Sequence, residues 1–301
     1  MFQVKAKITK NVCIREKYHK IILEQKGIVK TALPGQFVTV KVSDAGQPLL
    51  RRPLGIHQTR GKKFELLYEV IGEGTKILAQ RKAGEYLDII GPLGSGFGLG
   101  TAQKKPHPIL VAGGMGVAPL LFLAKKMGKA ESLVLIGAKN KKQVLCEKEF
   151  KALGCEVKIA TDDGSAGFKG KVTGLLIKLL STACPELVEG RSRGVNCELS
   201  TIYACGPRPM LVEISKISRE YNIPAQVSLE AHMACGIGAC LGCAVKVKDN
   251  APLPKGTSAK MIAECATCCG GWQSAPLLGD FSYKRVCKDG PVFDAAKIIW
   301  E

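Results

Sequence analysis

Cysteines in one short segment have the spacing of an iron–sulfur site. The sequence reads Cys-Gly-Ile-Gly-Ala-Cys-Leu-Gly-Cys, so four residues separate Cys235 from Cys240 and two separate Cys240 from Cys243. A further cysteine, Cys287, follows after forty-three more residues. This C-x4-C-x2-C…C order is typical of plant-type 2Fe–2S sites, whose two ferric ions need four soft thiolate ligands. We therefore expect a 2Fe–2S cluster on these four cysteines.

Two alternatives stay open for this site. Structural zinc also binds four cysteines, although its ligand pairs usually have C-x2-C spacing. Cys265, Cys268 and Cys269 lie between Cys243 and Cys287, and one of them could replace Cys287 as the fourth ligand. We choose Cys287 because residues 283–291 form a compact segment after a stretch rich in Pro, Gly, Ala and Ser.

A glycine-rich loop indicates a nucleotide site. Gly113, Gly114 and Gly116 lie between a predicted strand and a predicted helix. Glycines allow close backbone approach, and a helix N-terminus offers free N–H groups to a pyrophosphate. Further along, the segment Cys205-Gly206-Pro207 ends another strand, at the edge of a sheet where ligands bind. By itself that segment is more typical of a buried cysteine beside a turn.

An arginine-proline turn provides a third candidate site. Arg51 and Arg52 precede Pro53 in the segment Arg-Arg-Pro-Leu-Gly, and Gly72, Gly74 and Thr75 follow downstream. An arginine beside a turn, together with a glycine-threonine segment, suits a second phosphate group and a flat ring. The same residues are also ordinary turn chemistry.

The elements that position these residues change along the chain. In the first hundred residues Val4, Ala6 and Ile8 alternate with lysines, and residues 37–42 and 64–70 are β-rich. Several such short strands predict a small antiparallel barrel. Beyond residue 106, apolar strands alternate with helical periods, which predicts a doubly wound parallel sheet. We expect a barrel domain at 1–101, a parallel-sheet domain at 102–227 and a small cluster domain at 228–301, with mobile loop insertions at 181–200 and 249–280.

Composition excludes several classes of protein. The 301 residues carry a formal net charge of +18, but no nucleic-acid recognition motif accompanies it, so we expect no nucleic-acid partner. Charged residues interrupt the N-terminus where a signal peptide would be apolar, and glycines and Pro119 break the uncharged stretch 106–124. Thirteen cysteines without an export signal favour a reducing compartment. We expect a cytoplasmic protein with no membrane segment.

Taken together, these motifs resemble the ferredoxin–NADP reductase-like flavoproteins. The order is Arg-Pro-x-Gly, Gly-x-Gly-Thr, Gly-Gly-x-Gly-x-Ala-Pro and Cys-Gly-Pro. The segments 228–240 and 285–293 are similar, more narrowly, to the electron-transfer subunit of bacterial dihydroorotate dehydrogenase B. The resemblance implies an FAD-binding barrel, a Rossmann-like NAD-binding domain and a C-terminal 2Fe–2S domain.

The resemblance also implies cofactor contacts. The residues expected to hold FAD are Arg52, Pro53, Leu54, Gly55, Leu67, Tyr68, Glu69, Gly74 and Thr75. Those expected to hold the nicotinamide dinucleotide are Gly113, Gly114, Gly116, Asp162, Cys205, Gly206 and Pro207. Gly55 stands where many relatives have Ser or Thr, so a hydroxyl contact to the flavin is missing. Asp162 falls where NADPH-using relatives carry a basic residue; a carboxylate there repels a 2′-phosphate and accepts ribose hydroxyls, which favours NAD(H).

The family implies an oxidoreductase subunit with a partner. An FMN-containing catalytic subunit oxidises dihydroorotate in pyrimidine biosynthesis, and electrons pass through this chain's cluster and FAD to NAD+, with two copies of each chain. We expect no catalytic acid–base pair for pyrimidine here. The alternatives are a related subunit of an NADH-dependent ferredoxin:NADP oxidoreductase or of a sulfide dehydrogenase, a flavin and iron–sulfur redox sensor, and a zinc-clipped nucleic-acid-binding module.

Overall fold

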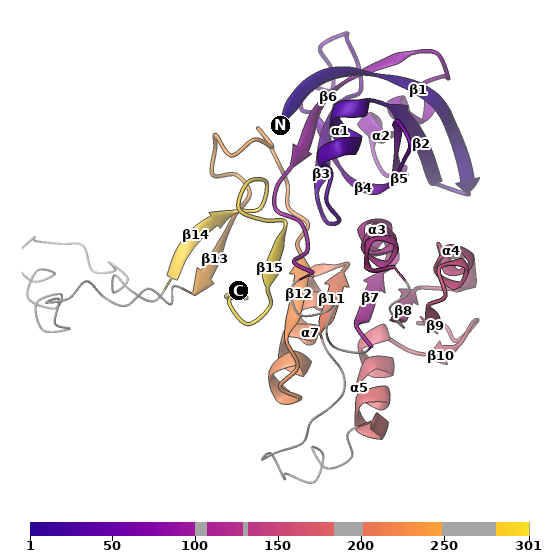
Figure 1. Cartoon of the computed structure of the whole chain (residues 1–301), viewed down its shortest axis with the longest axis vertical. Coiled ribbons are helices and arrows are strands. Elements are labelled where there is room, and N and C mark those ends of the chain that lie inside the picture. Colours follow the sequence, from indigo (N-terminus) through magenta and orange to yellow (C-terminus); the bar gives the residue numbers. More distant parts are fainter. Residues whose placement is uncertain (100–106, 129–131, 184–200, 249–280, 301) are drawn as a thin grey trace, which may run out of the picture.

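The computed structural model describes residues 1–99, 107–128, 132–183, 201–248 and 281–300. In these ranges the chain forms a closed barrel, a seven-stranded sheet and a two-stranded sheet. Figure 1 shows the barrel above the larger sheet, with the small sheet beside both. The two expected insertions lie largely outside the described residues, although a helix continues from 172 to 183.

The N-terminal barrel confirms the predicted fold of that region. Its strands are hydrogen-bonded in the closed order β1-β2-β5-β4-β3-β6, and its interior is filled by alternating residues such as Ala6 and Ile8. Two helices, which the strand pattern did not predict, complete it. The elements are β1 (Phe2–Arg15), β2 (Tyr18–Glu24), α1 (Lys26–Thr31), β3 (Phe37–Lys41), β4 (Arg52–Arg60), β5 (Lys63–Glu69), α2 (Glu73–Gln80) and β6 (Tyr86–Leu93).

The second sheet has the expected parallel topology. Its strand order is β10-β9-β8-β7-β11-β12-β15, and every neighbouring pair is parallel except β12 with β15. The strands are β7 (Ile109–Gly113), β8 (Leu133–Ala138), β9 (Glu156–Thr161), β10 (Phe168–Lys169), β11 (Ile202–Cys205), β12 (Ala225–Ser228) and β15 (Val292–Asp294). Because β15 comes from the predicted cluster domain, that segment is joined to the parallel sheet by a strand ladder.

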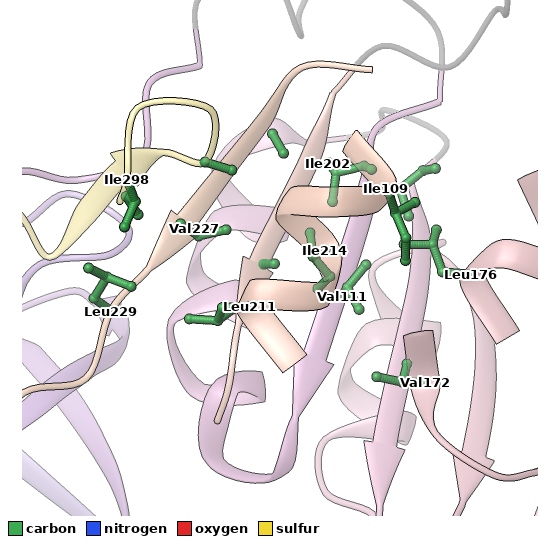
Figure 2. Close-up of a cluster of buried hydrophobic side chains, with 14 of the residues drawn as sticks. Ile109, Val111, Val172, Leu176, Ile202, Leu211, Ile214, Val227, Leu229 and Ile298 are labelled. Carbon is green, nitrogen blue, oxygen red and sulfur yellow. The ribbon is translucent and has the colours of Figure 1, made fainter. Parts of the chain in front are cut away.

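Helices cover both faces of this sheet. Alternate residues of β7 face opposite ways: Ile109 and Val111 pack with α5 (Val172–Ala183) and α7 (Arg208–Glu220), as Figure 2 shows. Leu110 and Ala112 pack with α3 (Val117–Met127) and α4 (Glu147–Ala152). Helix α3 also packs on the barrel, because Phe122 belongs to the barrel core. The barrel and the parallel sheet therefore pack against the same helix, which fixes their positions relative to each other.

The third sheet pairs β13 (Ala244–Lys248) with β14 (Phe281–Arg285) in antiparallel register. The ladder begins at Ala244 opposite Arg285. Among the described residues, no helix is long and apolar enough to cross a membrane.

Candidate functional site

One pocket of about 1510 Å³ lies between the barrel and the carboxyl edge of the parallel sheet. Its walls include every residue expected to hold FAD or the dinucleotide, apart from Gly116 and Gly206. The barrel side contributes Arg52, Pro53, Leu54, Gly55, Leu67, Tyr68, Glu69, Gly74 and Thr75. The sheet side contributes Gly113, Gly114, Asp162, Cys205 and Pro207. Sequence motifs about 150 residues apart thus meet around one cavity.

Gly116 and Gly206 do not line the pocket. They lie where two turns pack closely against each other. A Cβ on Gly116 would lie 1.8 Å from the carbonyl oxygen of Cys205, and one on Gly206 would lie 3.0 Å from Gly113 Cα. The turns follow β7 and β11, the neighbouring strands at which the strand order reverses. This reversal point is where open parallel sheets bind their ligands. Both glycines are needed for backbone contact between the turns.

The barrel end of the pocket has the chemistry of a phosphate site. Arg52 lies across the first turn of α2, since a Cβ on Gly74 would come within 2.3 Å of its Nε. The Thr75 hydroxyl accepts hydrogen bonds from the backbone N–H groups of Ile71 and Gly72, at 3.1 and 3.2 Å. A guanidinium beside a helix N-terminus suits a pyrophosphate.

Tyr68 lines the pocket, but its side chain is largely buried in the barrel core and is not exposed as a direct flavin contact would be. The residue is 2 % exposed and belongs to the barrel core, and its hydroxyl donates to Asn11 Oδ1 at 3.1 Å. Burial raises the pKa of Tyr68 to about 12. The neighbouring side chains on β5 point the other way, so Leu67 packs with Tyr18 of β2 at the pocket wall.

In the loop after β9, the neighbouring side chains Asp162 and Asp163 have different surroundings. Asp163 accepts hydrogen bonds from the backbone N–H and the hydroxyl of Ser165, at 2.9 and 2.6 Å, which holds it in a turn. Asp162 lines the pocket together with Lys139 and Lys171. Asp162 is therefore the residue of this pair that can meet a nucleotide ribose.

The first two cysteines of the motif lie side by side. The Sγ atoms of Cys235 and Cys240 are 3.3 Å apart, and the backbone N–H of Cys240 donates to Cys235 Sγ at 3.4 Å. Gly236 and Gly238 have φ angles of 68° and 86°, so the loop needs glycine to turn its amides inward. Hydrogen bonds from the amides of Cys240, Ile237 and Ala239 lower the pKa of Cys235 to about 6.

The β13–β14 ladder brings the other two cysteines together. Cys243 immediately precedes β13 and Cys287 follows β14 by two residues, so the pairing of Ala244 with Arg285 joins them. The Cys287 N–H donates to Cys243 Sγ at 3.4 Å. Both cysteines are buried, and burial raises the pKa of the Cys287 thiol to about 12.

Two cysteine pairs fit a cluster with two metal ions. Paired thiols that accept backbone hydrogen bonds, as Cys235 does from Cys240 and Cys243 does from Cys287, match the thiolate ligands of such a cluster. The four cysteines present therefore fit a 2Fe–2S group. Cys265, Cys268 and Cys269 lie outside the described residues.

Sequence reasoning missed many of the residues that line the pocket, and three of them lie at or next to a strand end. Tyr18, Ser228 and Glu230 all line the cavity, the last two at the end of β12. Ser228 is opposite Cys205 in the ladder of β12 with β11. The carboxyl ends of parallel strands lie at one edge of the sheet, where ligands bind. The position of Ser228 at the carboxyl end of β12 could therefore have indicated that it lies at the site.

Family comparisons agree with this geometry. Residues 230–257 and 264–299 match the family described as "Iron-sulfur cluster binding domain of dihydroorotate dehydrogenase B", and residues 110–216 match "Oxidoreductase NAD-binding domain". Barrel, parallel sheet and cysteine loop together define a ferredoxin–NADP reductase-like oxidoreductase subunit with an iron–sulfur domain. This confirms the predicted fold class and the expectation of an oxidoreductase.

Comparison with curated relatives identifies the family within this class of oxidoreductase subunits. A "Dihydroorotate dehydrogenase B (NAD(+)), electron transfer subunit" from Desulforamulus reducens is 38% identical over 278 residues, covering 91% of this chain and 89% of the relative. One of the same name from Caldanaerobacter subterraneus subsp. tengcongensis is 37% identical, covering 99% of each chain. The chain belongs to the family of dihydroorotate dehydrogenase B electron-transfer subunits. The expected cofactors, FAD, a 2Fe–2S cluster and NAD(H), are confirmed as those of this class.

Solved structures show the same architecture. The structure of an NADH-dependent reduced ferredoxin-NADP oxidoreductase, studied for flavin-based electron bifurcation, aligns with a TM-score of 0.73 and 28% identity, covering 98% of this chain and 90% of that chain. A ferredoxin-NADP+ reductase from Plasmodium falciparum aligns with a TM-score of 0.60 at 13% identity, covering 75% and 96%, and shares the fold.

Proposed function

We propose that this chain carries electrons from the FMN of a dihydroorotate-oxidising partner to NAD+, within pyrimidine biosynthesis. In this proposal Cys235, Cys240, Cys243 and Cys287 hold the 2Fe–2S cluster. The pocket residues of the barrel hold FAD, and those of the sheet edge hold NAD(H). Nicotinamide exchanges hydride and a 2Fe–2S cluster exchanges single electrons, so a flavin is the cofactor that can work between them.

The observation that carries the proposal is the adjacency of the cysteine pairs and the pocket. Thr39 of β3 contacts the cysteine loop at Gly236, and Pro53 lies opposite Thr39 in the neighbouring strand β4. A flavin held at Pro53 would therefore be separated from the cluster loop by one barrel strand. Arg52 and the first turn of α2 would bind its pyrophosphate, and the turns at Gly113 and Cys205 would position the nicotinamide.

The assembly follows from this function. The chain would pair with an FMN-containing catalytic subunit, as two copies of each, and that partner would bind and oxidise dihydroorotate. The thiolate ligands favour the cytoplasm, where cysteines stay reduced.

The test is to purify the chain with its native partner and record absorption spectra without oxygen. Dihydroorotate should bleach the flavin and cluster bands, and NAD+ should restore them. A complex that dihydroorotate leaves oxidised would contradict the proposal.

One second candidate has its own support. The full-length likeness to an NADH-dependent reduced ferredoxin-NADP oxidoreductase favours a related subunit of such a complex. Bleaching by reduced ferredoxin or NADPH, but not by dihydroorotate, would support that alternative.

A further inference from the structure

Gly238 is the residue at which the two cysteine pairs are joined. It lies in the loop between Cys235 and Cys240, and its N–H donates a hydrogen bond to the sulfur of Cys287, in the other pair. Its carbonyl oxygen accepts a hydrogen bond of 2.7 Å from Arg285 Nη1. Both polar groups of one loop residue are therefore bound, one by the last residue of β14 and the other by the cysteine that follows this strand.

The backbone at position 238 needs glycine and needs to be held from outside. Its φ is 86°, and a Cβ there would lie 2.6 Å from Lys288 Cδ. Because glycine is conformationally permissive, the direction of its N–H depends on the contacts that hold the residue. Arg285 supplies such a contact through the Gly238 carbonyl oxygen.

Asp289 orients the guanidinium that makes this contact. Its Oδ2 accepts hydrogen bonds from the backbone N–H of Arg285 at 2.8 Å and from Nε at 3.3 Å. A guanidinium holds its donors in a fixed fork, so the contact at Nε sets the direction of Nη1. The two side chains are 29 % and 30 % exposed, and an ion pair this accessible adds little to folding stability. Its main effect is therefore to fix the place where the guanidinium meets the cysteine loop.

We propose that Arg285 is a positioning residue for the iron–sulfur site, because it directs the Gly238 N–H at the sulfur of Cys287. The inference rests on the proposed binding of the cluster by the four cysteines. One-electron reduction of a 2Fe–2S cluster adds one negative charge to the cluster and its thiolates. A hydrogen bond to a ligand sulfur stabilises the more negative state, so it raises the reduction potential. Arg285 therefore raises the potential of the cluster through the Gly238 N–H.

Two substitutions on β14 separate this positioning role from the effect of positive charge. Arg285→Lys keeps the charge, but a single ammonium group lacks the fork that joins Asp289 to Gly238. Lys284→Gln is the matched control, because Lys284 is an exposed cation one residue earlier on the same strand. This control removes a neighbouring charge and leaves the fork intact.

The measurement is the midpoint potential of the cluster in the full-length chain, purified with its cofactors and without oxygen. A redox titration followed by EPR of the reduced cluster gives this potential, and flavin absorbance gives the flavin potential of the same sample. EPR detects only chains that hold a cluster, so partial loss of iron does not alter the result. An iron assay shows how many chains are loaded.

Arg285→Lys should lower the ratio of reduced to oxidised cluster at a fixed potential by about tenfold, which is a shift of about 59 mV to more negative potential for a one-electron couple. The flavin potential should stay as in wild type. Hydrogen–deuterium exchange should be faster in the peptide 235–243, because the loop has lost a contact. Lys284→Gln should keep the wild-type cluster potential and exchange rate.

A wild-type cluster potential in Arg285→Lys, or an equal shift in Lys284→Gln, would overturn the positioning role. Complete loss of iron from Arg285→Lys would also overturn it, because all four thiolates remain in that variant. A wild-type chain that holds no iron would instead contradict the proposed function. The two failures are therefore distinguishable.

Discussion

Thr39 of the barrel is in direct contact with Gly236 of the cysteine loop. A Cβ on Gly236 would lie 2.7 Å from Thr39 Cγ2, and Gly236 has a φ of 68°. Thr39 is 2 % exposed and pairs with Pro53 in the ladder of β3 with β4. This one contact joins the predicted cluster site to the predicted flavin site.

Gly236→Ala should therefore disturb the cluster site. An alanine with positive φ costs roughly 1–2 kcal/mol, and the methyl group would also push against Thr39. We expect less iron per chain and a lower unfolding temperature, measured by iron assay and thermal denaturation. Gly46→Ala is the control, because Gly46 has a φ of 81° but no atom within 4 Å of its Cβ position. Equal effects of both substitutions would contradict a specific role for the contact.

Cys240→Ser should remove the cluster but leave the flavin reactive. Loss of one thiolate disrupts the pair that Cys240 forms with Cys235. The cluster absorbance should disappear, while NADH oxidation by an artificial acceptor that takes electrons from FAD continues. Cys13→Ser, at an exposed position in the barrel, should change neither. Unchanged iron content in Cys240→Ser would refute the ligand assignment.

Asp162 should make the chain prefer NADH to NADPH. Its carboxylate would repel a 2′-phosphate, so kcat/KM for NADH should be higher, and Asp162→Asn should reduce the ratio by roughly tenfold, the effect of about 1.4 kcal/mol. Asp163→Asn keeps an acceptor oxygen for Ser165 and should retain the wild-type ratio. A wild-type kcat/KM for NADPH equal to or above that for NADH would show that Asp162 does not select the cofactor.

Buried His57 should make folding stability fall in mild acid. Its Nδ1 lies 3.1 Å from the carbonyl oxygen of Ala118 on α3, and burial lowers the pKa of His57 from 6.5 to about 4. Below pH 6.5 the unfolded chain binds a proton that the folded chain does not. The stabilisation is therefore complete above pH 6.5 and is lost progressively towards pH 4, by up to about 3 kcal/mol.

Urea unfolding of wild type and His57→Asn between pH 7 and pH 4 measures this contribution. Asparagine keeps a side-chain N–H for Ala118 but does not titrate, so the variant should lose less stability with falling pH. Parallel pH profiles would show that His57 is not responsible.

Local spacing was sufficient for some parts of the site and not for others. The C-x4-C-x2-C motif is sufficient to place Cys235, Cys240 and Cys243 in one short loop, because only a few residues separate them. The pairing of Cys243 with Cys287 depends on the register of β13 with β14, across forty-three intervening residues. No local pattern reports that register, so the choice of Cys287 over other cysteines could only be an expectation.

The direction of side chains on strands and the pairing of strands at sheet edges explain which features of the site the sequence did not reveal. Phe64, Leu66 and Tyr68 alternate into the barrel core, so the two-residue period of β5 could have shown that Tyr68 points inward. Ser228 could not be recognised in the same way, because its place at the pocket depends on the ladder that sets it opposite Cys205 of β11.

Cofactor content of the chain, purified without oxygen, tests the central claim most directly. We predict one FAD, two irons and two acid-labile sulfides per chain, with both flavin and cluster bands bleached by NADH. A preparation that holds flavin but neither iron nor acid-labile sulfide would contradict an electron path through the four cysteines.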